Sequence, residues 1–408
     1  MSKKPKPLED VRVLDLTIML AGPFCTMLLA DYGAEVIKIE MPGGGDPTRA
    51  IGPFVEKDKD RILGGYFFSI NRNKKSLTLN LKTEKGKEIF KELVKKSDVL
   101  VENFRPGVLE RLGLGYYDVL RKINPRLVYA TITGFGHPNI LKSPYWDRPS
   151  FDLIAQAMGG VMSITGPKGG PPLKTGPGIG DTWASLLTAF AIMAALHYAR
   201  RTGIGQHVDC SMYDAMLNCI ERAIVIYSIS GEVSVPMGNA HPLLAPYDAY
   251  KAKDGYVVIA AHWPKMWENL CKVIGREDLV NDPRFLTTNE RAKNYDQLKP
   301  IIEEWTSQRT RKEIIDILLK NDIPAGPINT VKDIFECPHV KAREMLVEVQ
   351  HPLNDKVKIV NAPVKMSETP GGVERPAPLP GEHNEEILCG LLGYSKSDVE
   401  KLKQEGVI

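Results

Sequence analysis

Asp181 is the residue of this sequence whose setting most suggests covalent chemistry. It stands in the stretch GPGIGDTWASLLTAF, where glycines precede an almost wholly apolar run. Two interpretations stay open from these residues alone. In the first, Asp181 caps a helix, because an aspartate oxygen accepts backbone N–H groups of the first turn and the helix dipole favours its charge. In the second, it is a carboxylate nucleophile in a cleft where Gly178 and Gly180 let a ligand approach the backbone.

Basic residues near the ends of several predicted strands are candidate ligands for phosphate groups. Any one of them is more typical of a solvated surface. Several at neighbouring strand ends would instead surround a nucleotide with several phosphates, arginine giving forked contacts and lysine point charges. These residues are Arg49, Arg72, Lys74, Lys75, Lys82, Arg105 and Arg111.

Two kinds of site are disfavoured by missing motifs. The segment LAGPFCTML after the first predicted strand lacks the G-x-G-x-x-G pattern of a dinucleotide site, although Glu40 stands where a ribose-binding acid would. We therefore expect no NAD. The six cysteines form no C-x-x-C pair and the eight histidines no H-E-x-x-H pair, so we expect no metal.

The composition is typical of a soluble, cytoplasmic protein. The 408 residues are 43% hydrophobic and 25% charged, with a net charge of +3 and no basic stripe, so we expect no nucleic acid. The apolar run Trp183–Leu196 is shorter than the roughly 20 residues that span a bilayer, which predicts a buried helix and no membrane. Scattered cysteines indicate reduced thiols in a cytosol.

Alternating strand and helix patterns must position these residues. Apolar or alternating runs predict strands, and Thr83–Lys96 has a helical spacing of apolar residues. This order predicts an α/β fold with a mostly parallel open sheet covered by helices on both faces, which binds ligands at the carboxyl ends of its strands. The predicted strands are 11–16, 35–40, 76–81, 98–104 and 126–134, with a further short strand in GQHVDCSM, residues 205–212.

A change of composition predicts a second, smaller α+β domain. Residues 230–255 are rich in glycine, proline and small residues and are typical of a linker. We expect residues 1–230 to form the first part of the large domain, 231–332 the small domain, and 333–408 a segment that returns to the large domain. Capping-box spacings predict helix starts at Thr310–Glu313 and Ser397–Glu400.

Six motifs, in order, resemble the family III CoA-transferases, which include formyl-CoA transferase, carnitine CoA-transferase and α-methylacyl-CoA racemase. The resemblance extends through GNAHPLLAPYDAY and GEHNEEIL to nearly the whole chain. It implies a Rossmann-like large domain, a small domain and a homodimer whose chains interlock as rings. The motifs are LDLTIMLAGPFCTMLLADYGAEVIKIE, NRNKKSLTLNLKTEKGK, VENFRPGVLERLGL, RPSFDLIAQAMGGVMSITG, GPGIGDTWASLLTAF and GQHVDCSMYDAML.

The resemblance implies that Asp181 is the nucleophile of an acyl-CoA:carboxylate CoA-transferase. Its carboxylate would form an aspartyl anhydride and then an aspartyl-CoA thioester, so coenzyme A is the co-substrate and the partners are an acyl-CoA and a small carboxylic acid. An aspartate with an ordinary pKa of about 3.9 is ionised without a general base. The helix start and nearby glycine N–H groups are expected to hold the developing oxyanion.

The positions that the resemblance assigns to coenzyme A match unevenly. Leu20 stands where formyl-CoA transferase has a glutamine, which argues against formate or oxalate, and Met41 replaces an arginine. Arg49 or Lys75 is then expected to meet a phosphate. The matching positions are Ala21, Leu79, Lys82, Asn103, Phe104, Arg105, Arg111 and Leu112.

Two alternatives and one loop stay open. A racemase or epimerase is disfavoured because Phe151, in PSFD, stands where racemases have a histidine and cannot move a proton. A coenzyme A-binding protein without turnover is the second alternative. Gly238 and Asn239 are expected either to form a mobile loop that closes over Asp181 or to make a turn between domains.

Overall fold

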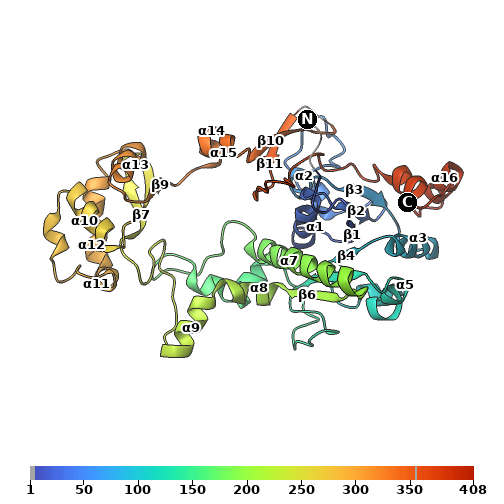
Figure 1. Ribbon diagram of the computed structural model, residues 1–408, viewed down its shortest axis with the longest axis horizontal. Helices are drawn as coiled ribbons and strands as arrows, with labels where there is room; N and C mark the ends of the chain where they lie inside the picture. The colour runs from blue at the N-terminus through green and yellow to red at the C-terminus, as the bar shows by residue number, and fades with distance from the viewer. Residues whose placement is uncertain (1–4, 354–355) are drawn as a thin grey trace. The chain divides into compact units, whose positions relative to one another are not determined.

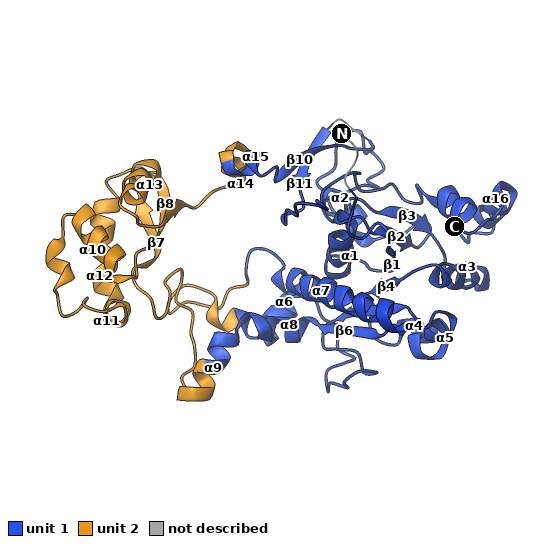
Figure 2. Cartoon of the chain, viewed as in Figure 1, with its two compact units in different colours: residues 1–161, 175–225, 339–408 blue, residues 162–174, 226–338 orange. Residues whose placement is uncertain are grey.

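The computed structural model describes residues 5–353 and 356–408 and divides the chain into two compact units (Figure 2). Unit 1 comprises residues 1–161, 175–225 and 339–408, and unit 2 comprises residues 162–174 and 226–338. The longer segment of unit 2 is residues 226–338, where the sequence predicts 231–332, and the unit also includes residues 162–174 from earlier in the chain.

The core of unit 1 is a six-stranded sheet in which every neighbouring pair is parallel (Figure 1). This confirms the α/β class with a parallel sheet. The strand order is β3-β2-β1-β4-β5-β6, so the order reverses between β1 and β4. The strands are β1 (Arg12–Asp15), β2 (Glu35–Glu40), β3 (Lys75–Thr78), β4 (Val99–Glu102), β5 (Val128–Thr133) and β6 (His207–Ser211).

Helices of unit 1 pack on the two faces of this sheet. Leu14 of β1 shares a core with Ile89 and Phe90 of α3, whereas Asp15, the next residue, bonds Thr26 of α1 on the opposite face. Helix α1 also packs against α7, which contacts β5 and β6. The longer helices are α1 (Ala21–Asp31), α2 (Gly65–Ile70), α3 (Glu84–Lys95), α6 (Asp152–Met158), α7 (Ile179–Thr202), α8 (Met212–Cys219) and α9 (Glu221–Ser230).

Helix α7 is longer than the apolar run that predicted it. It begins at Ile179 and ends before Gly203, whose φ of 76° suits glycine. By length and composition alone, α7 is the one helix among the described residues that could cross a membrane. Here it packs within unit 1, against α1, β5 and β6.

The C-terminal segment completes unit 1. The Asn80 backbone N–H donates to the Val407 carbonyl at 2.7 Å, and Leu388 lies in the main core beside α3. The predicted cap at Ser397 is wrong: the capping box is Ser395–Asp398, two residues earlier. The elements here are α15 (Pro338–Ala342), the antiparallel pair β10 (Leu346–Gln350) and β11 (Lys356–Val360), a π-helix Glu386–Leu391 and α16 (Lys396–Gln404).

Unit 2 is an antiparallel three-stranded sheet packed with helices around its own core. Residues 230–255 are not a linker throughout, because strand β7 lies within them. The strand forms by antiparallel pairing with β8, which buries its inward residues despite the flanking glycine and proline. The Thr310–Glu313 capping box is confirmed. The elements are β7 (Tyr247–Ala252), β8 (Gly255–Ala260), β9 (Ala325–Pro327), α10 (Pro264–Val273), α11 (Thr288–Lys293), α12 (Tyr295–Thr306), α13 (Arg311–Lys320) and α14 (Val331–Glu336).

Candidate active site

Asp181 is the third residue of helix α7, so it lies within the first turn and is not the helix cap. The residue before the helix is Gly178, and no side chain caps this end. The capping interpretation is therefore wrong, because a capping side chain precedes the first helical residue. The position still lies near the positive end of the helix dipole, which favours a carboxylate there.

The Asp181 carboxylate has no hydrogen-bond or ion-pair partner in the part of the chain that the structure describes. The side chain is half-buried. Burial, and second the negative charge of Asp152, raise the pKa of Asp181 to about 7. A half-buried acid that no cation neutralises has no evident structural role, and such perturbed acids concentrate at functional sites.

Asp152 positions the start of α7. It is the first residue of α6, and its Oδ1 accepts the Gly180 backbone N–H at 2.8 Å. Both of its carboxylate oxygens also accept the Gln156 Nε2 group, at 2.9 Å. Gln156 in turn accepts the Thr175 N–H at 3.0 Å. Since Asp152 takes the Gly180 N–H, that group is unavailable to an oxyanion, which corrects the expectation for this glycine.

Gly178 and Gly180 are required by close packing around the two carboxylates. A Cβ on Gly180 would lie 3.0 Å from Asp152 Oδ1 and 3.1 Å from its carbonyl oxygen. A Cβ on Gly178 would lie 3.1 Å from Leu20 Cδ2 and 3.5 Å from Asp181 Oδ2. The same point in space is thus adjacent to the Leu20 side chain and to the Asp181 carboxylate, so Leu20 borders the candidate nucleophile.

Leu20 and Asp181 lie near the point of the sheet where the strand order reverses, between β1 and β4. Leu20 ends the turn after β1, and Asn103 follows β4, the neighbouring strand. Asn103 Oδ1 accepts the Ile18 N–H, and its Nδ2 donates to the Ile18 carbonyl, both at 2.8 Å. Ligands of doubly wound sheets bind at this crevice outside the carboxyl ends of the strands. The Asn103 side chain, predicted to contact coenzyme A, is largely used to hold the β1–α1 turn.

Three of the predicted phosphate ligands are exposed and form no ion pair with a described residue. Lys82 follows β3, and Arg105 and Arg111 follow β4, and no described residue forms an ion pair with these three side chains. They lie in segments at the carboxyl edge of the sheet. These cations therefore remain available for an anionic ligand.

Arg49, Arg72 and Lys75 are not available in this way, which corrects the prediction for each. Arg49 donates to both Glu40 oxygens, at 2.7 and 2.6 Å, and to the Pro378 carbonyl. Arg72 makes a forked pair with Asp31 at 3.0 and 2.6 Å. Lys75 pairs with Glu35 and Glu386. These side chains hold separate segments of unit 1 together. Removing one member of a buried ion pair leaves the other charge buried without a partner.

The apolar candidates lie mainly in the protein interior. Leu79 is buried, and Phe104 and Leu112 are partly buried against the same core. The Ala21 carbonyl accepts the Ser185 hydroxyl of α7 at 2.5 Å. Any contact of these residues with coenzyme A would use their backbone or a small exposed part of the side chain.

Other predicted residues have different settings. Phe151 is 68% exposed, immediately before α6. Gly238 and Asn239 lie in unit 2, where the Gly238 N–H donates to the Gly166 carbonyl, so their closure over Asp181 stays a prediction. Among the described residues, no group of three or more His, Cys, Asp or Glu side chains is arranged to hold a metal ion.

Tyr66, Lys38 and Asp46 were not predicted from the sequence as residues of this region. Burial, and then the charges of Asp181, Asp46 and Asp152, raise the pKa of Tyr66, which places it near the candidate nucleophile. Lys38 and Asp46 form a fully buried ion pair. A lysine inside the apolar strand EVIKIE was a visible signal, because a charge between buried strand residues needs a partner.

Comparison with known proteins bears on these observations as a whole. The model of CoA-transferase family III matches residues 8–384. A succinyl-CoA:mesaconate CoA-transferase from Haloarcula marismortui is 48% identical over 385 residues, covering 93% of this chain and 95% of its own length. A succinyl-CoA:glutarate CoA-transferase from Mus musculus is 39% identical over 404 residues, covering 99% and 90%.

The fold is similar to that of a solved structure as well. The crystal structure of a CAIB/BAIF family protein from Brucella suis superposes with a TM-score of 0.85 at 37% identity, covering 95% of this chain and all of that one.

Proposed function

The chain belongs to CoA-transferase family III and is an enzyme that moves coenzyme A between carboxylic acids, and we propose that Asp181 is its covalent nucleophile. The resemblance seen in the sequence and the expected transferase activity are thereby confirmed. The racemase and the non-catalytic binding protein, which the sequence left open, are set aside. The role of Asp181 is supported by its half-buried carboxylate, which no described residue pairs with.

The proposed reaction exchanges oxygen and sulfur at acyl carbons. An Asp181 oxygen attacks the thioester carbonyl of the acyl-CoA, the C–S bond breaks, and coenzyme A leaves as thiolate from a mixed anhydride. The thiolate then attacks the Asp181 carbonyl carbon and releases the donor acid as carboxylate. The acceptor carboxylate repeats both steps in reverse and leaves as the new acyl-CoA. No proton is transferred, so the histidine that Phe151 replaces is not needed.

The chain's own residues supply position and charge for these steps. Asp152 holds the Gly180 N–H, which sets the first turn of α7 and the nucleophile on it. The N-terminal position on α7 favours the anion. Lys82, Arg105 and Arg111 are the cations proposed to meet the phosphates of coenzyme A, and Leu20 is proposed to border the acyl group.

We propose succinyl-CoA as donor and a five-carbon dicarboxylic acid as acceptor. The relatives described above are named for succinyl-CoA and for mesaconate or glutarate, both five-carbon diacids. The apolar Leu20 beside Asp181 supports an acceptor with a hydrocarbon chain rather than formate or oxalate.

The test is a transfer assay with succinyl-CoA and a panel of acids: formate, oxalate, butyrate, mesaconate and glutarate. New acyl-CoA is measured by liquid chromatography and mass spectrometry. We expect transfer to the five-carbon diacids and, for Asp181→Ala, a loss of roughly a thousandfold or more. Asp316→Ala, an exposed aspartate on α13, is the matched control and should keep full activity. Transfer by Asp181→Ala at the wild-type rate would contradict the proposal.

We also propose a cytoplasmic homodimer whose Gly238–Asn239 loop closes over the site. Large apolar side chains are exposed on α7 and α9 of the single chain, Phe190 at 75% and Ile229 at 82%, which supports burial against a second copy.

The six free cysteines support a reducing compartment. Light scattering on the purified protein tests the oligomeric state.

A further inference from the structure

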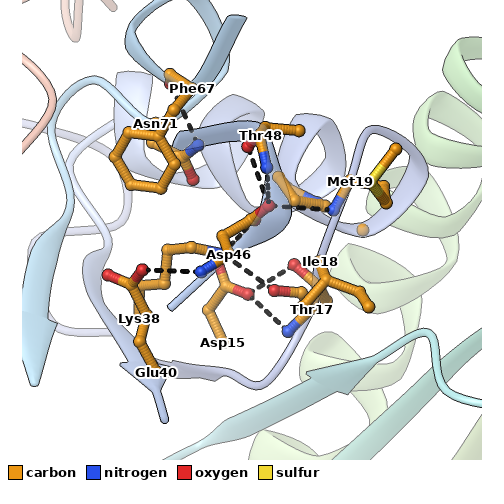
Figure 3. Close-up of polar contacts among 12 residues, drawn as sticks. Asp15, Thr17, Ile18, Met19, Lys38, Glu40, Asp46, Thr48, Phe67 and Asn71 are labelled. Atoms are coloured by element: carbon orange, nitrogen blue, oxygen red, sulfur yellow. Dashed lines mark hydrogen bonds and ion pairs between the residues drawn. The ribbon is translucent and has the colours of Figure 1, made fainter. Parts of the chain in front are cut away.

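The turn between β1 and α1 is held by side-chain contacts at each of three successive residues, Thr17, Ile18 and Met19. Figure 3 shows this turn with Asp15, Lys38 and Asp46 beside it. Backbone turns of this length usually satisfy their polar groups with water or with each other. Here the partners come from four different segments. Asp15 accepts the Thr17 N–H at 2.9 Å, Lys38 donates to the Thr17 carbonyl at 2.8 Å, Asn103 bonds both polar groups of Ile18 at 2.8 Å, and Asp46 accepts the Met19 N–H at 3.3 Å.

Met19 has the least favourable backbone conformation of the three. Its φ is 65°, in the left-handed region that residues other than glycine rarely adopt. A side chain there persists only where surrounding contacts over-determine the backbone. The Met19 N–H donates to Asp46 Oδ1 at 3.3 Å, and the same oxygen accepts the Thr48 N–H at 2.9 Å and the Thr48 hydroxyl at 2.7 Å.

Lys38 and Asp46 act as one unit on this turn. Both side chains are completely buried, and Lys38 Nζ lies 3.0 Å from Asp46 Oδ2. The Lys38 ammonium donates to the Thr17 carbonyl, and the Asp46 carboxylate accepts the Met19 N–H (Figure 3). The ion pair therefore bonds the backbone on both sides of Ile18, and we call this arrangement the clamp. The pair belongs to a buried network of charges, because Lys38 also interacts with Asp15, which Lys74 pairs with at 2.9 Å.

The clamped turn leads directly to the candidate nucleophile. Leu20 is the next residue. A Cβ atom placed on Gly178 would lie 3.1 Å from Leu20 Cδ2 and 3.5 Å from Asp181 Oδ2, so the Leu20 side chain and the Asp181 carboxylate are close to each other. The following carbonyl, of Ala21, accepts the Ser185 hydroxyl, one helical turn after Asp181 on α7. A change in the backbone at Met19 would therefore move the apolar wall beside Asp181.

We propose that the Lys38–Asp46 pair is a positioning device for acyl transfer: it holds Met19 in its left-handed conformation and so fixes Leu20 against Asp181. The proposal rests on the proposed role of Asp181. It assigns to a buried ion pair, which touches neither substrate nor coenzyme A, the alignment of the acyl group with the nucleophile. Neither residue is a catalytic residue in this account.

The test measures the rate of covalent CoA attachment to the enzyme after mixing with succinyl-CoA, together with the dissociation constant of the thioester. Asp46→Ala removes the contact to Met19, and we expect the attachment rate to fall roughly 5- to 30-fold, the factor that corresponds to the cost of an unsupported left-handed residue. The dissociation constant should change less than about threefold, because the exposed cations Lys82, Arg105 and Arg111 are untouched. Asp46→Asn keeps an acceptor oxygen for the Met19 N–H but sets an amide NH2 group against the Lys38 ammonium, so the attachment rate should fall, though less than in Asp46→Ala.

Rescue by glycine distinguishes positioning from simple loss of stability. Glycine adopts a positive φ without support, so Met19→Gly added to Asp46→Ala should recover most of the lost rate, whereas a merely destabilised core would gain nothing. If Asp46→Ala does not fold, Lys38→Met with Asp46→Leu removes both charges of the pair, and the buried Asp15 keeps Lys74 as its partner. The same loss and the same rescue are expected.

Two results would overturn the proposal while leaving Asp181 as nucleophile. One is a folded Asp46→Ala protein that attaches CoA within twofold of the wild-type rate. The other is a loss of rate that Met19→Gly does not restore. A wild-type protein that never attaches CoA would instead refute the role of Asp181, so the two failures are distinguishable.

Discussion

At the scale of single residues, the account depends on an aspartate that is kept free of partners. Arg49, Arg72 and Lys74 are each paired with a carboxylate, whereas Asp181 has no such partner among the described residues. A carboxylate in a salt bridge has its charge already satisfied and is a poor nucleophile. Burial without a counter-charge disfavours the ionised form of Asp181, so leaving it unpaired lowers the free energy of unfolding. Such a loss of stability is common at functional sites.

The pH dependence of the reaction follows from this environment. The ionised carboxylate is the attacking form and its pKa is raised to about 7, so the rate of CoA attachment should rise with pH through about 7 and level off above it. One pH unit below the midpoint, the rate should be about tenfold below its plateau. Single-turnover rates between pH 5 and 9 measure this.

Asp152→Asn provides the matched variant for that profile. It keeps an oxygen that accepts the Gly180 N–H but removes the negative charge that helps to raise the Asp181 pKa. The midpoint should therefore shift to lower pH with a similar plateau. A wild-type midpoint near 4 would contradict the account of burial, and an unchanged midpoint in the variant would contradict the role of Asp152.

The sequence could predict the type and place of the nucleophile but not the partners of the cations. Asp181 stands out because glycines precede it and an apolar helix follows. Arg49, by contrast, binds the Pro378 carbonyl, more than three hundred residues away. Its partners depend on the packing of distant segments, which local patterns do not carry.

At the scale of elements, the start of α7 is built to fix the nucleophile. Gly180 lies against Asp152, and the Asp152 carboxylate bonds it from α6. The helix itself was predictable from its apolar run, but its first residue was not. Two glycines at its start removed the local signal, and the start is set by contacts with α6 and the β1–α1 turn.

Replacing Gly180 and, as a control, Gly176 by alanine tests the packing at the start of α7. In Gly180→Ala the new Cβ would meet both Asp152 Oδ1 and its carbonyl oxygen, so we expect a loss of about 1–3 kcal/mol in the free energy of unfolding and a rate lowered by tenfold or more. Gly176→Ala is the control, since nothing lies within 4 Å of its Cβ position, and it should behave like the wild type. Thermal unfolding and CoA-attachment rates measure both effects; equal behaviour of the two variants would contradict the packing argument.

At the scale of the whole chain, the last seventy residues are part of the unit that carries Asp181. Leu388 is completely buried in the same core as Phe90 of α3. Leu388→Ala should therefore cost about 2–5 kcal/mol in unfolding free energy, measured by chemical denaturation. Leu319→Ala, on an exposed site of α13, should cost far less. Equal losses in the two variants would show that the segment does not contribute to the core.

The sequence predicts a boundary near residue 230 from its change of composition, and the longer segment of unit 2 begins at residue 226. The assignment of residues 162–174 to unit 2 was not predictable. That segment joins through contacts such as the Gly238 N–H to the Gly166 carbonyl, which link positions far apart in the sequence. Strand β7 was missed for the same reason, since its pairing with β8 outweighs its own weak strand pattern.

The most direct measurement is the intact mass of the protein after brief incubation with succinyl-CoA, followed by peptide mapping. We predict a mass increase equal to coenzyme A less one water, located on the peptide that contains Asp181 and absent from Asp181→Ala. Attachment of coenzyme A at any other residue, or transfer that proceeds with no covalent species under rapid quench, would contradict the account.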